Sequence, residues 1–281
     1  MIGLQINGSG RLILKSTPLY CVIGDPITHS RSPEIHRFFA DQQADSIKYE
    51  SKRVDEASFQ NFVRNFFESG GAGLNITLPH KESAYLLCDE LSERAALSRA
   101  VNTLFMDDLG LLHGENTDGL GLVRDIVNNH GVVIRNKRIL IIGAGGAARG
   151  VIHDLVSCNP ASVSIINRTH HRAEALAKYF NVEALEVKVA FERNFDLIIN
   201  ATASSLVGEL PPICSEMLAP NCCCYDMMYS KEDTSFVRWA RENGVSRTMD
   251  GLGMLVEQAA EAFFLWRGSR PITAPLLKIL R

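Results

Sequence analysis

The segment RILIIGAGGAARG, residues 138–150, constrains the fold of this chain more than any other. An apolar run ending at Ile142 leads directly into a glycine-rich stretch and then into a helical pattern, which matches G-x-G-x-x-G/A between a strand and a helix. Gly143 permits the tight turn, Gly145 lets a pyrophosphate approach the backbone, and Ala148 lets the helix pack on the strand. The free N–H groups of the helix N-terminus attract phosphates. The segment therefore favours dinucleotide binding over a purely structural turn.

The end of the following strand indicates which dinucleotide is bound. An acid there would hold a ribose hydroxyl, but the chain has Asn167, Arg168 and Thr169, with no carboxylate before Glu174. Arg168, with Arg172 one turn later, suits a 2′-phosphate. The alternative is that these arginines only form a solvated basic helix start. We favour NADP binding, because the absence of an acid and the presence of an arginine both indicate this coenzyme.

Short apolar runs alternate with helical patterns along the chain. The pattern predicts strands at 19–24, 47–52, 73–77, 138–142, 163–167, 195–200, 222–226 and 245–249, and a hairpin formed by 100–107 and 111–116. It predicts helices at 33–44, 55–68, 117–129, 147–158, 171–180, 233–243 and 252–268. This alternation predicts an α/β fold with parallel βαβ units and sheets covered on both faces.

Composition excludes several classes of protein. With 281 residues, 46% hydrophobic and 22% charged, the chain has an ordinary globular composition and room for two domains. A net charge of −3 favours neither nucleic acid nor an anionic membrane as a partner. No apolar run reaches the roughly 18 residues of a membrane span, and the first 15 residues lack the features of a secretory signal.

Cysteine usage indicates the compartment. The seven cysteines are an odd number with no C-x-x-C pair, and Cys222, Cys223 and Cys224 alternate across a strand, so they cannot all face one metal. We expect reduced thiols, a cytoplasmic location and no metal site.

A set of hydrogen-bonding residues lies at the predicted element ends outside the glycine-loop segment. Each has a structural explanation by itself, such as a helix cap or a buried amide. Together they suit a small polyhydroxylated ligand, and a neighbouring dinucleotide domain suggests hydride transfer to or from it. They are Ser30, Ser32, Thr77, Asn102, Asp118 and Gln258.

These features resemble the NADP-dependent shikimate dehydrogenases of chorismate and aromatic amino acid biosynthesis. The resemblance covers nearly the whole chain from Cys21 onward, because the family's motifs occur in the family's order. They are DPITHSRSPEIH, GLNITLPHK, AVNTL, GENTDGLG, GAGGAARG, NRT, YDMMY and DGLGMLVEQAAEAFFLW. The resemblance implies reversible reduction of 3-dehydroshikimate to shikimate with NADPH. It implies a substrate domain, residues 1–117 completed by 252–281, and a Rossmann-like NADP domain, residues 118–251, in a monomer or homodimer.

The resemblance also assigns the site residues by motif. Substrate contacts would be Ser30, Ser32, Thr77, Lys81, Asn102, Asp118, Tyr229 and Gln258. Coenzyme contacts would be Glu93, Gly143, Ala144, Gly145, Gly146, Ala147, Asn167, Arg168, Thr169, Arg172, Met227 and Gly251. Lys81 and Asp118 would be the catalytic pair. A positioned ammonium can deliver a proton to the ketone oxygen as hydride reaches carbon, whereas a lone lysine after a strand is usually a surface residue.

The chain departs from the family's motifs at a few positions. Asp25, Arg31 and Arg37 replace commoner residues, and NATASSL replaces the more usual NATSxG, so we expect the backbone at Ser204–Ser205 to differ from the family's beside the nicotinamide. Three alternatives remain at this point. They are a quinate/shikimate dehydrogenase with relaxed cofactor use, a catalytically silent NADP sensor, and another hydride-transferring enzyme on the same fold.

Overall fold

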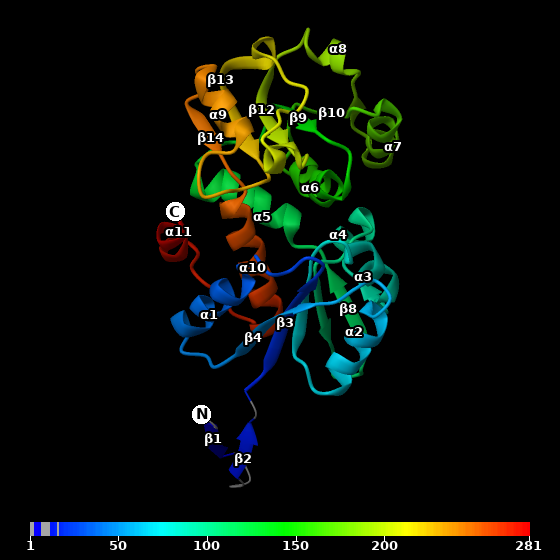
Figure 1. The fold of residues 1–281 in the computed structure, drawn as a ribbon, viewed down its shortest axis with the longest axis vertical. Helices are drawn as coiled ribbons and strands as arrows, with labels where there is room; N and C mark the ends of the chain where they lie inside the picture. Colours follow the sequence, from blue (N-terminus) through cyan, green and yellow to red (C-terminus); the bar gives the residue numbers. More distant parts are fainter. Residues whose placement is uncertain (1–2, 7–11, 16) are drawn as a thin grey trace. The chain divides into compact units, whose positions relative to one another are not determined.

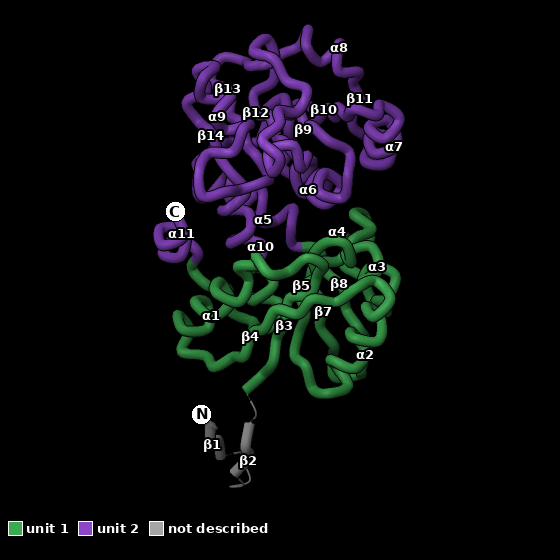
Figure 2. Tube along the Cα trace, in the orientation of Figure 1, with its two compact units in different colours: residues 1–116, 259–272 green, residues 117–258, 273–281 purple. Residues whose placement is uncertain are grey.

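The computed structural model describes residues 3–6, 12–15 and 17–281, which form two compact units (Figure 2). Unit 1 comprises the described residues up to Asn116 together with Ala259–Ile272, and unit 2 comprises Thr117–Gln258 and Thr273–Arg281. The chain passes from one unit to the other between Asn116 and Thr117, between Gln258 and Ala259, and between Ile272 and Thr273, so the last long helix is divided between the units. The functional domain boundaries at 117 and 251 stay a prediction.

Unit 1 contains a mixed six-stranded sheet (Figure 1). In spatial order its strands are β4 (Lys48–Arg53), β3 (Leu19–Gly24), β5 (Gly73–Ile76), β7 (Thr103–Met106), β8 (Leu112–Glu115) and β6 (Glu90–Leu91). β3 pairs with β4 and β5 in parallel, whereas β7 is antiparallel to β5 and β8. The start of β7 therefore lies beside the end of β5. A separate antiparallel pair, β1 (Gly3–Ile6) and β2 (Leu12–Lys15), precedes this sheet.

Apolar side chains alternate along β3 and pack on both faces of this sheet. Tyr20 and Val22 belong to one buried cluster, and Cys21 and Ile23 belong to another. The helices of the unit are α1 (Ser32–Gln42), α2 (Phe59–Glu68), α3 (Lys81–Leu87), α4 (Glu93–Ser98) and the second half of α10 (Leu252–Arg267).

Unit 2 contains a fully parallel six-stranded sheet. In spatial order its strands are β11 (Glu183–Ala184), β10 (Ser162–Ile166), β9 (Arg138–Ile142), β12 (Phe195–Asn200), β13 (Leu218–Asp226) and β14 (Arg247–Met249). Numbered within the unit, this is the order 3-2-1-4-5-6 of a Rossmann fold, and the direction of succession reverses between β9 and β12. Ligands bind at the carboxyl end of such a switch point.

The two faces of the unit 2 sheet are covered by separate apolar clusters. Ile139 and Ile141 of β9 pack into one, and Leu140 and Ile142 pack into the other. The helical elements are α5 (Asp118–Arg124), the π-helical turn η1 (Asp125–Asn129), α6 (Gly146–Ser157), α7 (His170–Phe180), α8 (Val187–Ala190), the 3₁₀ turns Ser204–Val207 and Ser215–Met217, α9 (Ser235–Glu242), the first half of α10 and α11 (Ala274–Leu280).

The predicted fold class is confirmed: the chain forms two α/β units, one of them Rossmann-like, and part of the last long helix belongs to the first unit. Boundaries differ in detail. The helix predicted for 117–129 is α-helical only to Arg124 and continues as the π-helical turn. The short elements α3, α4, α8 and α11 were not predicted. Among the described residues, no helix has the length and apolar character that crossing a membrane requires.

His36 is an unusual core residue of unit 1. It is 0% exposed, and its ring stacks on Tyr49 with centroids 4.4 Å apart and an interplanar angle of 8°. Neither ring nitrogen has a hydrogen-bond partner within the described part of the chain. Burial lowers the pKa of His36 to about 3, so the native protein holds a neutral imidazole.

We predict that His36 makes unit 1 sensitive to acid. The pKa of His36 in the folded protein lies below the value of about 6.5 in the unfolded chain, so the unfolded chain takes up the proton first as pH falls. The stability that is present above about pH 6.5 is therefore lost as pH falls toward the folded pKa. When pH falls from about 7 to about 5, protonation of His36 in the unfolded chain should lower the free energy of unfolding by about 2 kcal/mol. His36→Leu should remove that contribution, whereas His29→Leu, at an exposed position, should keep it.

The measurement is urea unfolding at both pH values, followed by Trp266 fluorescence in a Trp239→Phe background so that unit 1 alone is observed. An unchanged pH dependence in His36→Leu would contradict the prediction.

Candidate functional site

The carboxyl-terminal edge of β3 and β5 in unit 1 carries most of the predicted substrate residues. Ser30 and Ser32 follow β3, and Thr77 and Lys81 follow the neighbouring parallel strand β5. Asn102 directly precedes β7, whose start pairs with the end of β5. The topology of one sheet thus brings these five polar residues to a single edge.

The two serines lie at the start of α1. Ser32 is the first residue of the helix and is buried, and its backbone N–H donates to Ser30 Oγ at 3.3 Å. Pro33 fits the first turn because its missing N–H would have no partner there. Ser30 therefore contributes to the helix start, and this structural role is compatible with ligand binding.

The connection from β5 to α3 is held at both ends. Thr77 donates its backbone N–H to Ile23 O at 3.0 Å and accepts from His80 N at 3.0 Å. His80 is 0% exposed, and its Nε2 donates to Val54 O at 2.7 Å, since a carbonyl can only accept. Lys81 follows this anchored residue as the first residue of α3 and is half-buried. The helix dipole disfavours a cation at this position, so helix stability gives little reason for a lysine here.

Asn102 is held by its backbone and by its side chain. Its N–H donates to Glu115 O at 3.0 Å, and its carbonyl accepts from Ile76 N at 2.8 Å. Its side-chain Oδ1 accepts from Thr103 Oγ1 at 2.9 Å, and the residue is 3% exposed. A buried amide held in this way can present a defined polar group to a ligand.

The glycine loop in unit 2 follows β9 as predicted. Gly143 has φ +113°, a region that favours glycine, and a Cβ there would lie 3.1 Å from Thr202. Helix α6 begins at Gly146, where a Cβ would meet nothing within 4 Å, and the same holds for Gly145. Ala148 is 0% exposed. The loop therefore offers exposed backbone at a helix N-terminus, as a dinucleotide phosphate requires.

Asn167 connects this loop to the end of β10. Its Oδ1 accepts from Ala144 N at 3.2 Å, and its Nδ2 donates to Thr169 O at 2.9 Å. Arg168 and Arg172 are exposed beside it. Within residues 3–6, 12–15 and 17–281, neither arginine makes an ion pair, so both guanidinium groups are available to an anion.

The loop after β12 is anchored by Asp226, a residue that the motif analysis did not assign. This carboxylate is 0% exposed and accepts from Ser205 Oγ at 2.6 Å, Thr234 Oγ1 at 2.6 Å, Asn200 Nδ2 at 3.1 Å and Met228 N at 3.1 Å. Burial raises the pKa of Asp226, while the hydroxyl donors oppose that shift. Ser205, one of the departures from the family's motif, thereby ties the loop to the end of β13.

The remaining predicted residues of unit 2 form two groups. Asp118 is the first residue of α5, and its neighbour Thr117 contacts Gln258 of α10 at 3.4 Å between Oγ1 and Oε1. Met227 and Gly251 lie together, because a Cβ on Gly251 would be 2.2 Å from Met227 O. Tyr229 is half-buried two residues beyond Met227. Glu93 is different: it is an exposed residue of unit 1, whereas the other predicted coenzyme residues lie in unit 2.

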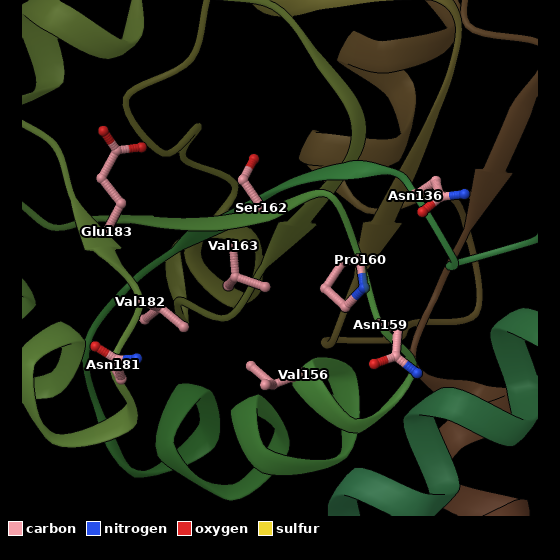
Figure 3. A pocket seen from close by; sticks show the side chains of 9 residues that line it. All are labelled: Asn136, Val156, Asn159, Pro160, Ser162, Val163, Asn181, Val182 and Glu183. Atoms are coloured by element: carbon pink, nitrogen blue, oxygen red, sulfur yellow. The ribbon is translucent and has the colours of Figure 1, made fainter.

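Unit 2 has an open hollow of about 630 Å³ that lies away from the carboxyl-terminal ends of its strands (Figure 3). Its walls include Pro160 and Ser162 at the amino end of β10 and Glu183 of β11. Dinucleotides bind at carboxyl ends, so this hollow is not the predicted coenzyme site. In the described part of the chain, no cluster of three or more His, Cys, Asp or Glu residues is arranged to hold a metal ion.

The fold and these two polar strand edges define a two-unit α/β protein of the dinucleotide-dependent dehydrogenase type. Three family models match the chain. They are the shikimate dehydrogenase substrate binding domain at 22–104, shikimate / quinate 5-dehydrogenase at 124–208, and the shikimate 5′-dehydrogenase C-terminal domain at 251–281.

A curated relative from Alkalilimnicola ehrlichii, named shikimate dehydrogenase (NADP(+)), is 52% identical over 94% of this chain and 99% of its own length. An Ael1 enzyme structure from Pseudomonas putida is 41% identical with a TM-score of 0.90, covering 94% of this chain and 98% of that one. A Thermus thermophilus shikimate 5-dehydrogenase in complex with NADP(H) and shikimate is 31% identical with a TM-score of 0.85, covering 93% and 98%. The chain belongs to the shikimate dehydrogenase family, a family of oxidoreductases, and the predicted resemblance is confirmed.

Proposed function

We propose that this chain is a shikimate dehydrogenase that reversibly reduces 3-dehydroshikimate to shikimate with NADPH. The observation that carries the proposal is the near full-length match, at 52% identity, to a relative named shikimate dehydrogenase (NADP(+)). The reaction would serve chorismate and aromatic amino acid biosynthesis in the cytoplasm, carried out by a monomer or homodimer.

The residues of unit 2 suit NADP. The glycine loop, from Gly143 to Ala147, would hold the pyrophosphate, and the exposed guanidinium groups of Arg168 and Arg172 would hold the 2′-phosphate. Asn167, Thr169, Met227 and Gly251 would complete this contact set, and we retain Glu93 as a further coenzyme contact. When bound as NADPH, the coenzyme supplies the hydride.

The residues of the chain itself would bind the substrate and move the proton. Ser30, Ser32, Thr77, Asn102, Tyr229 and Gln258 would bind the hydroxyl and carboxylate groups of the substrate. Lys81 would hydrogen-bond the ketone oxygen, stabilise the negative charge that develops there and deliver the proton. Asp118 would be its acidic counterpart. In the reverse direction, neutral Lys81 would take the hydroxyl proton.

A quinate/shikimate dehydrogenase with relaxed cofactor use is the second candidate, since one matching family model carries both substrate names. Arg168 argues against relaxed cofactor use because it stands where an acid would serve NAD. The test is NADP reduction by the purified protein with shikimate, quinate and simple hydroxy acids, each also measured with NAD. Turnover confined to shikimate with NADP supports the proposal, and comparable turnover of quinate would establish the second candidate.

We predict that Lys81→Ala lowers kcat by about 10²-fold or more, the usual scale for loss of a positioned acid–base group, while the substrate KM changes less. Because the helix dipole disfavours a cation at the start of α3, removing the ammonium should not weaken the helix, and the melting temperature should change little. Lys52→Ala, which removes an exposed lysine of the same unit, is the control and should keep kcat. A kcat near the wild-type value in Lys81→Ala would refute the catalytic assignment.

We predict that NADPH is preferred over NADH by at least about tenfold in kcat/KM, because charge-assisted hydrogen bonds to a phosphate typically contribute about 1.5–3 kcal/mol each. Arg168→Asp should repel the 2′-phosphate and offer a ribose hydroxyl an acceptor, so the preference should shrink sharply or reverse. Arg135→Asp is the control, since it makes the same charge change at an exposed position before β9. Equal use of both coenzymes by the wild type, or an unchanged ratio in Arg168→Asp, would show that Arg168 does not read the phosphate.

A further inference from the structure

A chain of buried hydrogen bonds runs across unit 1 and ends on Asn102. Tyr49 Oη lies 2.7 Å from Asn75 Oδ1, and Asn75 Nδ2 lies 3.2 Å from both Asn102 O and Thr103 Oγ1. Thr103 Oγ1 in turn lies 2.9 Å from Asn102 Oδ1. All four residues are at most 7% exposed, so water cannot easily replace a missing partner.

Strand pairing brings these side chains together. Asn75 of β5 is directly opposite Thr103 of β7, which places their side chains on the same face of the sheet. Tyr49 of β4 belongs to the aromatic cluster of that face and reaches Asn75 across β3. The stack on His36, at 4.4 Å, holds the tyrosine ring in place.

One backbone carbonyl sets the direction of the whole chain. Asn102 O can only accept, so the side-chain amide of Asn75 must turn Nδ2 toward it and Oδ1 toward Tyr49. Tyr49 must then donate, and burial raises the pKa of Tyr49 well above its usual range, so the hydroxyl keeps its proton. The opposite amide orientation would place two oxygen atoms 3.2 Å apart without a proton between them.

The same reasoning about donors and acceptors determines the orientation of the Asn102 side chain. Nδ2 of Asn75 also donates to Thr103 Oγ1, so the threonine hydroxyl is already an acceptor and has its own proton to donate. Asn102 Oδ1 receives that proton. The amide of Asn102 is therefore fixed with its oxygen toward Thr103 and its NH₂ group turned away from it.

We propose that Tyr49, Asn75 and Thr103 form an orienting relay, a set of positioning residues that fixes Asn102 as a hydrogen-bond donor toward the substrate. The proposal rests on the proposed function, which assigns Asn102 as a substrate contact. It deepens that function by setting the chemistry of recognition: at Asn102 the site selects a ligand oxygen that accepts a hydrogen bond. A ligand that offers only a donor there meets a group that cannot turn to accept.

The first experiment breaks the relay at Thr103 without changing the side-chain volume much. Thr103→Val should raise the KM for shikimate about tenfold or more, while kcat changes by less than about threefold, because the loss is one of binding orientation. Thr103→Ser keeps the hydroxyl and should restore the wild-type KM. Tyr49→Phe leaves Asn75 Oδ1 without its buried donor, which weakens the hold on that amide, and should raise KM in the same direction.

Tyr20→Phe is the matched control. Tyr20 faces Tyr49 in the register of β3 and β4 and is also buried, but its hydroxyl contacts Arg267 rather than the relay. Its KM should stay at the wild-type value. Equal KM values for Tyr49→Phe, Thr103→Val and the wild type would overturn the proposal, and so would a failure of Thr103→Ser to restore KM.

A double-mutant cycle separates orientation from general damage to the fold. If Thr103 acts only through Asn102, then Thr103→Val in an Asn102→Ala background should cause no further rise in KM. An additive rise of about tenfold in that background would show that Thr103 acts by another route and would overturn the relay.

A ligand-free measurement distinguishes failure of the relay from failure of the proposed function. The side-chain amide signals of Asn102 in ¹⁵N-labelled protein are identified by their loss in Asn102→Ala. These signals should shift in Thr103→Val and stay unchanged in Tyr20→Phe. If the wild type is inactive on shikimate, the shikimate assignment is rejected, and the amide signals still test the relay. If the signals are unchanged in Thr103→Val, the relay is rejected even when the enzyme is active.

Discussion

Parallel pairing of neighbouring strands is the constraint on which both polar edges depend. In unit 2, β9 and β12 stay in register up to Ile142 opposite Asn200, and Ala201 N then donates to Ile142 O at 2.9 Å. The glycine loop and the loop after β12 therefore leave the sheet side by side. In unit 1, the pairing of β3 with β5 does the same for the connections that carry Ser32 and Lys81. Backbone hydrogen bonds thus decide which side chains can meet, before those side chains make any contact of their own.

The sequence predicts this frame well because its signals are local. Strands 19–24, 138–142 and 195–200 have the predicted bounds, since each is a short apolar run bounded by polar or turn residues. The glycine loop is recognisable because every residue of the turn is contiguous. The edge position of Asn102 also follows from the predicted hairpin, which needs only a turn between two adjacent runs.

The rest depends on partners that are distant in sequence. Tyr49 and Asp226 resemble ordinary strand residues until the neighbouring strands are known, because the partner of Tyr49 is 26 residues away and one partner of Asp226 lies at the same separation. The π-helical turn also contains contacts between residues that are distant in sequence. Asp125 is buried there against Gly253, where a Cβ would lie 1.9 Å from its carboxylate, and Tyr225 donates to it at 2.7 Å from 100 residues away. Periodicity contains no information about such contacts.

Burying polar groups at the carboxyl-terminal edges of the two sheets costs free energy that apolar core side chains would not cost. Replacing a satisfied polar pair by apolar side chains of the same shape is often neutral or stabilising, whereas removing one partner is destabilising. Asp226 accepts from four donors, and Asn102 Oδ1 accepts from the Thr103 hydroxyl, so these oxygens avoid that penalty and each group is held in a single orientation. Ser205 extends this logic, because its hydroxyl adds a donor to Asp226 at a position where the family's motif usually has glycine. The loop after β12 is therefore held by side-chain hydrogen bonds to Asp226 as well as by its own turn.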